Sequence, residues 1–386
     1  MFYATKGGIA LGGNNEDYSD PNTGMFIIPG RNCKNGWIKF GFLGGFPQGG
    51  MNEKGLFYDA TGCAYLPMPA SEAEKQLYDG PLMQKVMEEC GTVQEALAVF
   101  SDFYCEDQYR AQYLIGDAAG MSIIVEGDNI IVKEKHYQVL TNFYQSHPEL
   151  GGYPCWRYNT AVSILEDASD ITPRLFGEIL SATHQEGRYP TRYSNIYDLN
   201  RQIVYVFHSH NYDEFISVDL IEELGKGQRT YTLSQLFSKM KIINPANEAV
   251  TSSASVTFEW TGQKDSMYKL YCSTDPEMAD CTPIQVTGDS LDSNPILMAC
   301  IGSFLLGIAS IGKRRSRRAF LLLLLASSLS CGESALNPDN DGNISFSATV
   351  ENLQPDTDYF WKVVASTQNG SPFTNETPLR TFKTSG

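Results

Sequence analysis

Short apolar runs separated by glycine-containing turns recur along the first part of the chain, and they constrain its fold most strongly. The runs either alternate apolar with polar residues or are rich in β-branched and aromatic residues, which is typical of strands. Turn sequences such as Gly-Asp at 116–117 and 127–128 bound them. This pattern predicts a fold built mainly of strands, at residues 8–11, 37–42, 112–115, 122–125, 130–132 and 202–207.

Three helices are expected between these strands. Apolar residues recur at three- and four-residue steps in 79–89, 93–100 and 157–167. Thr92 precedes the second of these segments and Glu95 stands three residues after it, which predicts a capping box. Many strands with interspersed helices predict an α+β arrangement, in which helices cover a sheet-on-sheet core. We expect this arrangement to form one domain over residues 1–240.

The sequence changes character at residue 244. Alternating strand-like runs follow, at 256–260, 268–272, 344–350 and 360–365. A Leu-x-Pro-x-Thr-x-Tyr sequence occupies 353–359, and a tryptophan, Trp260, lies in the first run. Residues 244–386 thereby resemble a fibronectin type III domain. Because such an all-β sandwich needs roughly 90–100 residues, about 45 residues are surplus.

The surplus contains two apolar segments around a basic cluster. The chain has 29 Lys+Arg against 45 Asp+Glu and a net charge of −16, which argues against nucleic acid as a partner. Basic residues nevertheless cluster at 313–318, between apolar residues 296–312 and 319–331. The order predicts an inserted transmembrane hairpin over 296–331, with its basic turn cytoplasmic. Since both segments are shorter than the roughly 20 residues that span a bilayer, an interfacial segment and a lipoprotein-type signal are alternatives.

The nine cysteines are scattered, and the chain has no Cys-x-x-Cys pair. The five histidines lack the His-Glu-x-x-His spacing of a metal site. We therefore expect no metal and no cofactor. Cys272 and Cys281 flank a polar turn, and either they form a disulfide, which would indicate an oxidising compartment, or both stay free thiols.

Four clusters of polar residues in the first domain are candidates for a chemical site. They occupy 12–18, 49–62, 139–143 and 154–159. Each is ordinary when taken singly, because Asn-Glu-Asp is commonly a solvated loop and Thr-Asn commonly caps a turn. Their order and spacing are more informative than any one of them.

Taken together, the clusters resemble the linear amide C–N hydrolases, the choloylglycine hydrolase and penicillin V acylase family of N-terminal-nucleophile hydrolases. The resemblance covers about residues 2–215. Its most specific motifs are Gly-x-Asn-x-Asp at 13–17, Gly-Met-Asn-Glu-Lys-Gly-Leu at 50–56, Tyr-Leu-Ile-Gly-Asp at 113–117 and Val-Leu-Thr-Asn at 139–142. The fold that this resemblance implies is a four-layered αββα sandwich.

The resemblance also implies a mechanism. In this family an N-terminal cysteine attacks an amide carbonyl as a thiolate, and its own α-amino group is the base. Asp17 matches the aspartate that orients the amine, and Asn142 matches the donor to the developing oxyanion. A second donor, a backbone N–H, would lie near Thr61 and Gly62. Arg157 resembles the arginine that fixes the catalytic centre through charge-assisted hydrogen bonds.

Two positions depart from the family pattern. Asn14 stands where the family commonly has arginine, which should alter thiolate stabilisation or substrate contacts, so Asn14 is a further candidate site residue. The family's Cys-Thr or Cys-Ser pair should precede Phe2, so the nucleophile is expected just before Met1. Neither Cys33 nor Cys63 can replace it, because neither presents a free α-amine. A start assigned too late, a truncated gene product and a pseudoenzyme are the three explanations.

The expected function is hydrolysis of a linear, non-peptide amide in a small molecule, such as an N-acyl amide, a bile-salt conjugate or a penicillin-type side chain. Acyl transfer through the same thioester is one alternative, and a non-catalytic surface binding module is another. A hydrolase-like domain joined to a fibronectin-like domain and an apolar hairpin predicts an exported, membrane-anchored protein, with its domains on the periplasmic or extracellular side.

Overall fold

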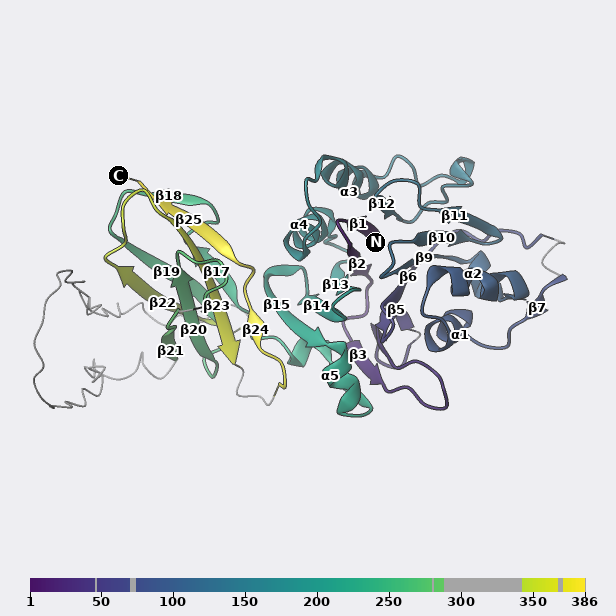
Figure 1. Ribbon diagram of the computed structural model, residues 1–386, viewed down its shortest axis with the longest axis horizontal. Helices are drawn as coiled ribbons and strands as arrows, with labels where there is room; N and C mark the ends of the chain where they lie inside the picture. Colours follow the sequence, from purple (N-terminus) through teal and green to yellow (C-terminus); the bar gives the residue numbers. More distant parts are fainter. Residues whose placement is uncertain (46, 70–73, 280, 288–341, 367–370, 386) are drawn as a thin grey trace, which may run out of the picture. The chain divides into compact units, whose positions relative to one another are not determined.

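The computed structural model describes residues 1–45, 47–69, 74–279, 281–287, 342–366 and 371–385 (Figure 1). The chain divides into two compact units. The first unit holds Met1–Lys241 together with Val364–Pro378, and the second holds Ile242–Val363 and Leu379–Gly386. The segment 364–378, which the sequence pattern assigns to the second domain, is therefore part of the first unit.

One sheet of the first unit brings distant parts of the chain to the same edge. β1 pairs antiparallel with β12, with Phe2 opposite Val139, and with β2, with Phe2 opposite Gly13. Asp17 at the end of β2 lies opposite Thr191 at the start of β13. Within the unit the strand order is β12 (Tyr137–Val139), β1 (Phe2–Lys6), β2 (Ile9–Asp17), β13 (Thr191–Asp198), β14 (Ile203–His208), β15 (Asn211–Asp219) and β24 (Asn375–Glu376).

The second sheet of this unit is antiparallel throughout the pairings described. Its order is β11 (Asn129–Val132), β10 (Ser122–Glu126), β9 (Ala111–Asp117), β6 (Leu56–Gly62), β5 (Pro47–Asn52), β4 (Trp37–Phe42), β3 (Thr23–Ile28) and β16 (Arg229–Thr232). A buried cluster joins the two sheets, with Tyr3 and Tyr197 from the first and Phe40 and Phe57 from the second. Burying one such side chain contributes roughly 1.5–3 kcal/mol, so this cluster holds the sheets together.

Helices pack on each of the two sheets. α1 (Leu82–Glu89) and α2 (Val93–Asp102) share a buried cluster with β4, β6, β9 and β10. α3 (Trp156–Asp167) and α4 (Pro173–Thr183) share another with β1, β2, β12, β13 and β14. The remaining elements are β7 (Gln76–Leu77), β8 (Phe103–Tyr104) and α5 (Leu220–Gly225), with short 3-10 helices at Glu106–Tyr109, Pro148–Leu150 and Leu233–Gln235.

The mixed, strand-rich character expected from the sequence is confirmed, as is the capping box of Thr92 and Glu95. The expected strand at 8–11 continues to Asp17, because the polar residues that follow it pair with β13. The helix α4 was not expected, although Thr172 caps it by accepting from the backbone N–H of Leu175 at 3.1 Å. Local apolar spacing thus located elements better than it located their ends.

The Gly-Met-Asn-Glu-Lys-Gly-Leu motif forms the end of β5, the turn that follows it and the start of β6. Asn52 within it is fully buried, and its Nδ2 donates to the carbonyl oxygens of Met87 and Cys90 at 2.8 and 2.7 Å. Its Oδ1 accepts from two backbone N–H groups of the same turn. Because the last carbonyls of a helix lack partners within the helix, Asn52 ties this turn to the end of α1. The motif supports the sheet that carries Thr61.

A buried carboxylate and amide join 364–378 to the rest of the first unit. Glu214 on β15 accepts from the N–H groups of Ser238 and Met240 at 2.8 and 3.0 Å, and from the Ser238 hydroxyl. Asn375 on β24 donates to the carbonyl oxygen of Leu236 at 3.0 Å and accepts from the N–H of Ser238 at 3.2 Å. Both side chains are almost fully buried. Each needs these partners, since an unpaired buried polar group is costly.

The contribution of Glu214 to the stability of the first unit should fall as the pH rises from about 4.5 to about 7. Burial raises the pKa of Glu214 from 4.5 to about 7, against hydrogen bonds that lower it. Because the folded pKa exceeds the unfolded one, this stabilising contribution is complete below the unfolded pKa and is lost as pH rises through the folded pKa. We expect Glu214→Gln to flatten this slope in urea denaturation across that window. The exposed control Glu178→Gln should keep it, and equal slopes in the wild type and Glu214→Gln would contradict the assignment.

The second unit contains a three-stranded sheet and a second set of paired strands around an aromatic core. One contains β17 (Lys241–Asn244), β19 (Ser255–Gly262) and β22 (Ile344–Glu351), and the other β18 (Ala249–Thr251), β20 (Met267–Ser273), β21 (Ile284–Thr287), β23 (Asp358–Ser366) and β25 (Arg380–Thr384). Trp260 stacks on Phe346, and Phe258 meets Trp361 edge-on. The hydroxyl of Tyr359 accepts from the N–H of Gln354 at 2.9 Å, a contact like the tyrosine corner of β-sandwiches.

The hairpin expected at 296–331 lies outside the described residues. Among the residues that the structure does describe, no helix is long and apolar enough to cross a membrane. Membrane association through 296–331 therefore stays a prediction.

Candidate active site

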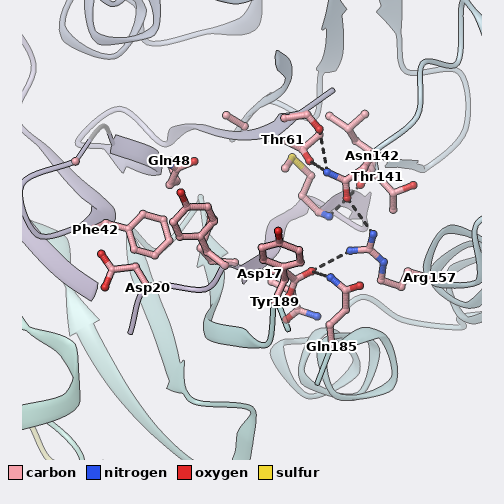
Figure 2. Close-up of a pocket in the computed structure, with 18 of the residues that line it drawn as sticks. Asp17, Asp20, Phe42, Gln48, Thr61, Thr141, Asn142, Arg157, Gln185 and Tyr189 are labelled. Carbon is pink, nitrogen blue, oxygen red and sulfur yellow. Dashed lines mark hydrogen bonds and ion pairs between the residues drawn. The ribbon is translucent and has the colours of Figure 1, made fainter. Parts of the chain in front are cut away.

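A cavity of about 790 Å³ lies at the edge where β1 begins and β2 ends (Figure 2). The strand register explains its position, because β1 starts beside the end of β12 and β2 ends beside the start of β13. Side chains reach the cavity from β2, β6, the segment after β12, α3 and the segment after α4. Residues separated by more than a hundred positions in the chain therefore meet here.

Asp17 lies at the centre of a hydrogen-bond network in this cavity. Its Oδ2 accepts from Nη1 of Arg157 at 2.9 Å and from Nε2 of Gln185 at 2.7 Å. The hydroxyl of Thr191 donates to Oδ1 at 2.5 Å. The Asp17 and Arg157 side chains are only 12% and 18% exposed, so their attraction is screened less than at an open surface. Both carboxylate oxygens are thus held by protein donors.

Arg157 extends this network to Asn142. Its Nη2 donates to Oδ1 of Asn142 at 2.9 Å. The amide nitrogen of Asn142 therefore points away from Arg157. That Nδ2 donates to the carbonyl oxygen of Gly62 at 3.1 Å and to the hydroxyl of Thr61. Figure 2 shows the chain of contacts from Gln185 through Asp17, Arg157 and Asn142 to Thr61. A substrate oxygen that reaches Nδ2 would take the place of one of these acceptors.

The backbone start of β1 lies in the same cavity. The amine of Met1 donates to the carbonyl oxygen of Leu140 at 3.0 Å. Burial lowers the pKa of this amine to about 6; the charge of Asp59 opposes the shift and that of Arg157 adds to it. An amine with such a pKa is mostly neutral at pH 7, so an amine in this environment can accept a proton.

Two buried carboxyl groups lie close to this amine. Glu16 lines the cavity but is only 9% exposed, and Asp59 is 1% exposed. Burial and the charge of Asp17 raise the pKa of Glu16 to about 8. Burial and the charge of Glu16 raise the pKa of Asp59. Gly49 leaves room for the carboxyl group of Asp59, since a Cβ at position 49 would lie 2.2 Å from Oδ2 of Asp59. The environment favours the neutral form of both carboxyls.

The cavity wall away from the network is aromatic. The rings of Tyr18 and Phe42 lie 4.7 Å apart between centroids, and Tyr189 lines the cavity as well. Figure 2 shows Phe42 and Gln48 on the opposite side of the cavity from Asn142. Tyr18 and Tyr189, the latter beside Asp17 in Figure 2, are 48% and 46% exposed, so both rings offer apolar area to a bound molecule.

The structure brings five of the six sequence-predicted residues together: Asp17, Asn142, Arg157, Thr61 and Gly62. The sixth, Asn14, is buried and is not among the residues that line the cavity. It lies on β2 two residues before Glu16, and its side-chain nitrogen is buried without a hydrogen-bond partner among the described residues.

Several residues in and beside this site carried no signal in the sequence. Gln185 and Thr191 hold Asp17 from about 170 positions away, and Glu16 and Asp59 lie in ordinary strand sequences. Gln185 and Tyr189 reach the cavity from segment 184–190, which follows α4, a helix that the sequence pattern did not predict. Within the described ranges, no group of three or more His, Cys, Asp or Glu side chains is arranged to hold a metal ion.

No protein-family model matches the sequence, and no curated protein matches it. Among solved structures, penicillin V acylase from Agrobacterium tumefaciens is similar at 14% identity and a TM-score of 0.45, over 54% of this chain and 82% of that chain. The sensor domain of the anti-sigma factor RsgI4 from Pseudobacteroides cellulosolvens is similar at 17% identity and a TM-score of 0.20, over 39% and 91%. The proposed function rests on the residues of the site.

Proposed function

We propose that this site hydrolyses a linear amide bond of a small N-acyl compound, with a cysteine just ahead of Met1 as the nucleophile. One observation carries the proposal: the start of β1 enters the same cavity as the network of Asp17, Arg157 and Asn142. A residue that precedes Met1 would continue from this point. The cavity of about 790 Å³ leaves room for it and for a small substrate.

The chemistry follows from the groups around that position. A neutral α-amine takes the proton of the cysteine thiol, and the thiolate attacks the carbonyl carbon of the amide. The carbonyl oxygen becomes an oxyanion, to which Nδ2 of Asn142 donates in place of Thr61. The ammonium returns its proton to the leaving nitrogen as the C–N bond breaks. Water then hydrolyses the thioester, which releases the acid and restores the thiol.

The network explains why the donor is ready before substrate binds. Arg157 holds Oδ1 of Asn142, so the amide cannot rotate without losing a charge-assisted contact. Asp17 in turn holds Arg157, with Gln185 and Thr191 behind it. Such preorganised donors lower a barrier because they do not have to reorient during the reaction.

The same proposal includes a fold for each of the two units. The two sheets of the first unit, with α1 and α2 packed on one and α3 and α4 on the other, support the four-layered αββα sandwich that the sequence resemblance implies. The paired sheets and the Tyr359 corner of the second unit support a fibronectin type III-like domain. An exported, membrane-anchored location remains part of the proposal.

The direct test compares the chain that begins at Met1 with one extended in the natural reading frame to the Cys-Thr or Cys-Ser pair expected before Phe2, with that cysteine at its N-terminus. Release of amine is measured over a panel of N-acyl amino acids, penicillin V and conjugated bile salts. We expect release from the extended protein only, and none when its cysteine is replaced by alanine. An in-frame stop codon directly ahead of Met1, or an inactive extended protein, would overturn the proposal. Products that contain an added acceptor amine would indicate acyl transfer instead.

Asn142→Ala in the extended protein should lower kcat/KM about 100-fold, because one oxyanion donor is lost. The exposed Asn159→Ala on α3 is the matched control and should leave kcat/KM unchanged. If Asn142→Ala keeps full activity on a substrate that the parent cleaves, the assigned donor is wrong while hydrolysis itself still stands.

A further inference from the structure

Two cysteines of the second unit are brought together by a hairpin. β20 and β21 pair antiparallel, with Leu270 opposite Ile284. Cys272 lies two residues beyond this pair on β20, and Cys281 lies three residues before it on the approach to β21. Since paired strands stay adjacent towards their connecting turn, the two cysteines face the same end of the hairpin.

The turn itself holds the sulfur of Cys281 against Cys272. Sγ of Cys281 lies 3.3 Å from the carbonyl oxygen of Cys272. The carboxylate of Asp275 accepts from the N–H groups of Glu277 and Ala279 at 3.1 and 3.2 Å, which folds the turn back towards β20. The N–H of Cys281 donates to the carbonyl oxygen of Met278 at 3.2 Å. These contacts hold the sulfur of Cys281 beside the backbone of Cys272, so the turn is already ordered where a cross-link would close it.

The two thiols differ in their surroundings. Burial, and then the charge of Cys281, raise the pKa of Cys272 to about 12. Both cysteines are free thiols in the structure, and both are partly exposed rather than fully buried, so a small-molecule disulfide can reach them. Cys90 and Cys105, by contrast, are buried in the core between α1, α2 and their sheet. Cys272 and Cys281 therefore lie close to each other and are accessible to a small-molecule oxidant.

We propose that Cys272 and Cys281 form a disulfide that closes the turn between β20 and β21. The bond would fasten β21, the four-residue strand at the end of its sheet, to β20 at the turn. A cross-link that closes a short loop stabilises a fold mainly by restricting the unfolded chain. The proposal concerns the second unit and is independent of the proposed hydrolysis.

The oxidant is a small-molecule disulfide such as oxidised glutathione. The thiolate of Cys281 attacks one of its sulfurs, and one glutathione thiolate leaves. The thiolate of Cys272 then attacks the Cys281 sulfur of this mixed disulfide, and the second glutathione leaves. Two cysteine thiols are oxidised to one disulfide while one oxidised glutathione becomes two reduced ones. Because burial raises the pKa of Cys272 and so disfavours its thiolate, the first attack is assigned to Cys281, whose sulfur the turn holds at 3.3 Å from the Cys272 carbonyl oxygen.

The test equilibrates the full chain with oxidised and reduced glutathione, blocks free thiols, and maps peptides by mass spectrometry without reduction. We expect a peptide pair joined through Cys272 and Cys281, and two fewer blocked thiols than in the reduced chain. Cys33→Ser, which changes an exposed cysteine of the first unit, should leave this linkage intact. Full blocking of both cysteines after oxidation, or linkage of either one to another cysteine, would overturn the proposal.

Single variants test the order of attack on the same folded chain. Cys272→Ser should accumulate a glutathione adduct on Cys281, because the resolving thiol is missing. Cys281→Ser should leave Cys272 largely unmodified under the same conditions. Equal adduct formation in both variants would contradict the assigned order, and the linkage in the parent chain would still decide whether the disulfide exists.

Discussion

Arg157→Ala should lower kcat/KM of the cysteine-bearing protein about 1,000-fold, more than the loss of Asn142 alone. Arg157 is the one side chain that contacts both Asp17 and Asn142 in the network described here. Its removal frees the amide of Asn142 to rotate and leaves a mostly buried carboxylate without its counter-charge. The measurement is kcat/KM on the best substrate of the panel.

Arg157→Lys separates position from charge. A lysine keeps a positive charge near Asp17, but its single ammonium cannot reproduce the planar fork that reaches Asp17 and Asn142 at once. We therefore expect activity between that of the parent and that of Arg157→Ala. Arg174→Ala removes an exposed arginine of α4 that pairs with Glu178 and should change neither activity nor thermal unfolding. If Arg157→Ala retains activity within a few-fold of the parent, the network does not position the oxyanion donor.

Gly50→Ala should abolish soluble folded protein or lower the unfolding free energy of the first unit by about 3 kcal/mol. A Cβ at Gly50 would lie 2.2 Å from the carbonyl oxygen of Ile38 and 3.1 Å from the Cα of Lys39. Both atoms belong to the backbone of β4, which pairs with β5 at this point. A backbone cannot swing aside as a flexible side chain does, so the strands must separate.

The matched control is Gly225→Ala. A Cβ at Gly225 would meet no heavy atom within 4 Å, and the backbone of this glycine is not left-handed, so the change should alter stability by less than about 1 kcal/mol. Urea denaturation of both variants, followed by tryptophan fluorescence, makes the comparison. A Gly50→Ala protein as stable as Gly225→Ala would show that the two strands have more freedom than this register implies.

The local pattern of the sequence located several elements of the first unit but few of those that position the site. The run at 37–42 is β4, and the sequence Thr-Val-Gln-Glu at 92–95 begins α2 with its capping box. These features depend on neighbours two to four residues apart, which a strand or helix period makes visible. The motif at 50–56 was also recognisable in the sequence, but its Asn52 hydrogen-bonds to the end of α1 and does not line the cavity.

Motif order in the sequence also singled out Asp17, Asn142 and Arg157, yet their contacts were decided only by the tertiary structure. The antiparallel register of β12, β1, β2 and β13 places the end of β12 and the end of β2 at the same edge of the sheet. Arg157 on α3 then contacts Asp17 there. Gln185, Thr191 and the segment 364–378 join the same unit without a local signal. Short-range periodicity encodes which face a residue takes, whereas long-range pairing decides which residues it meets.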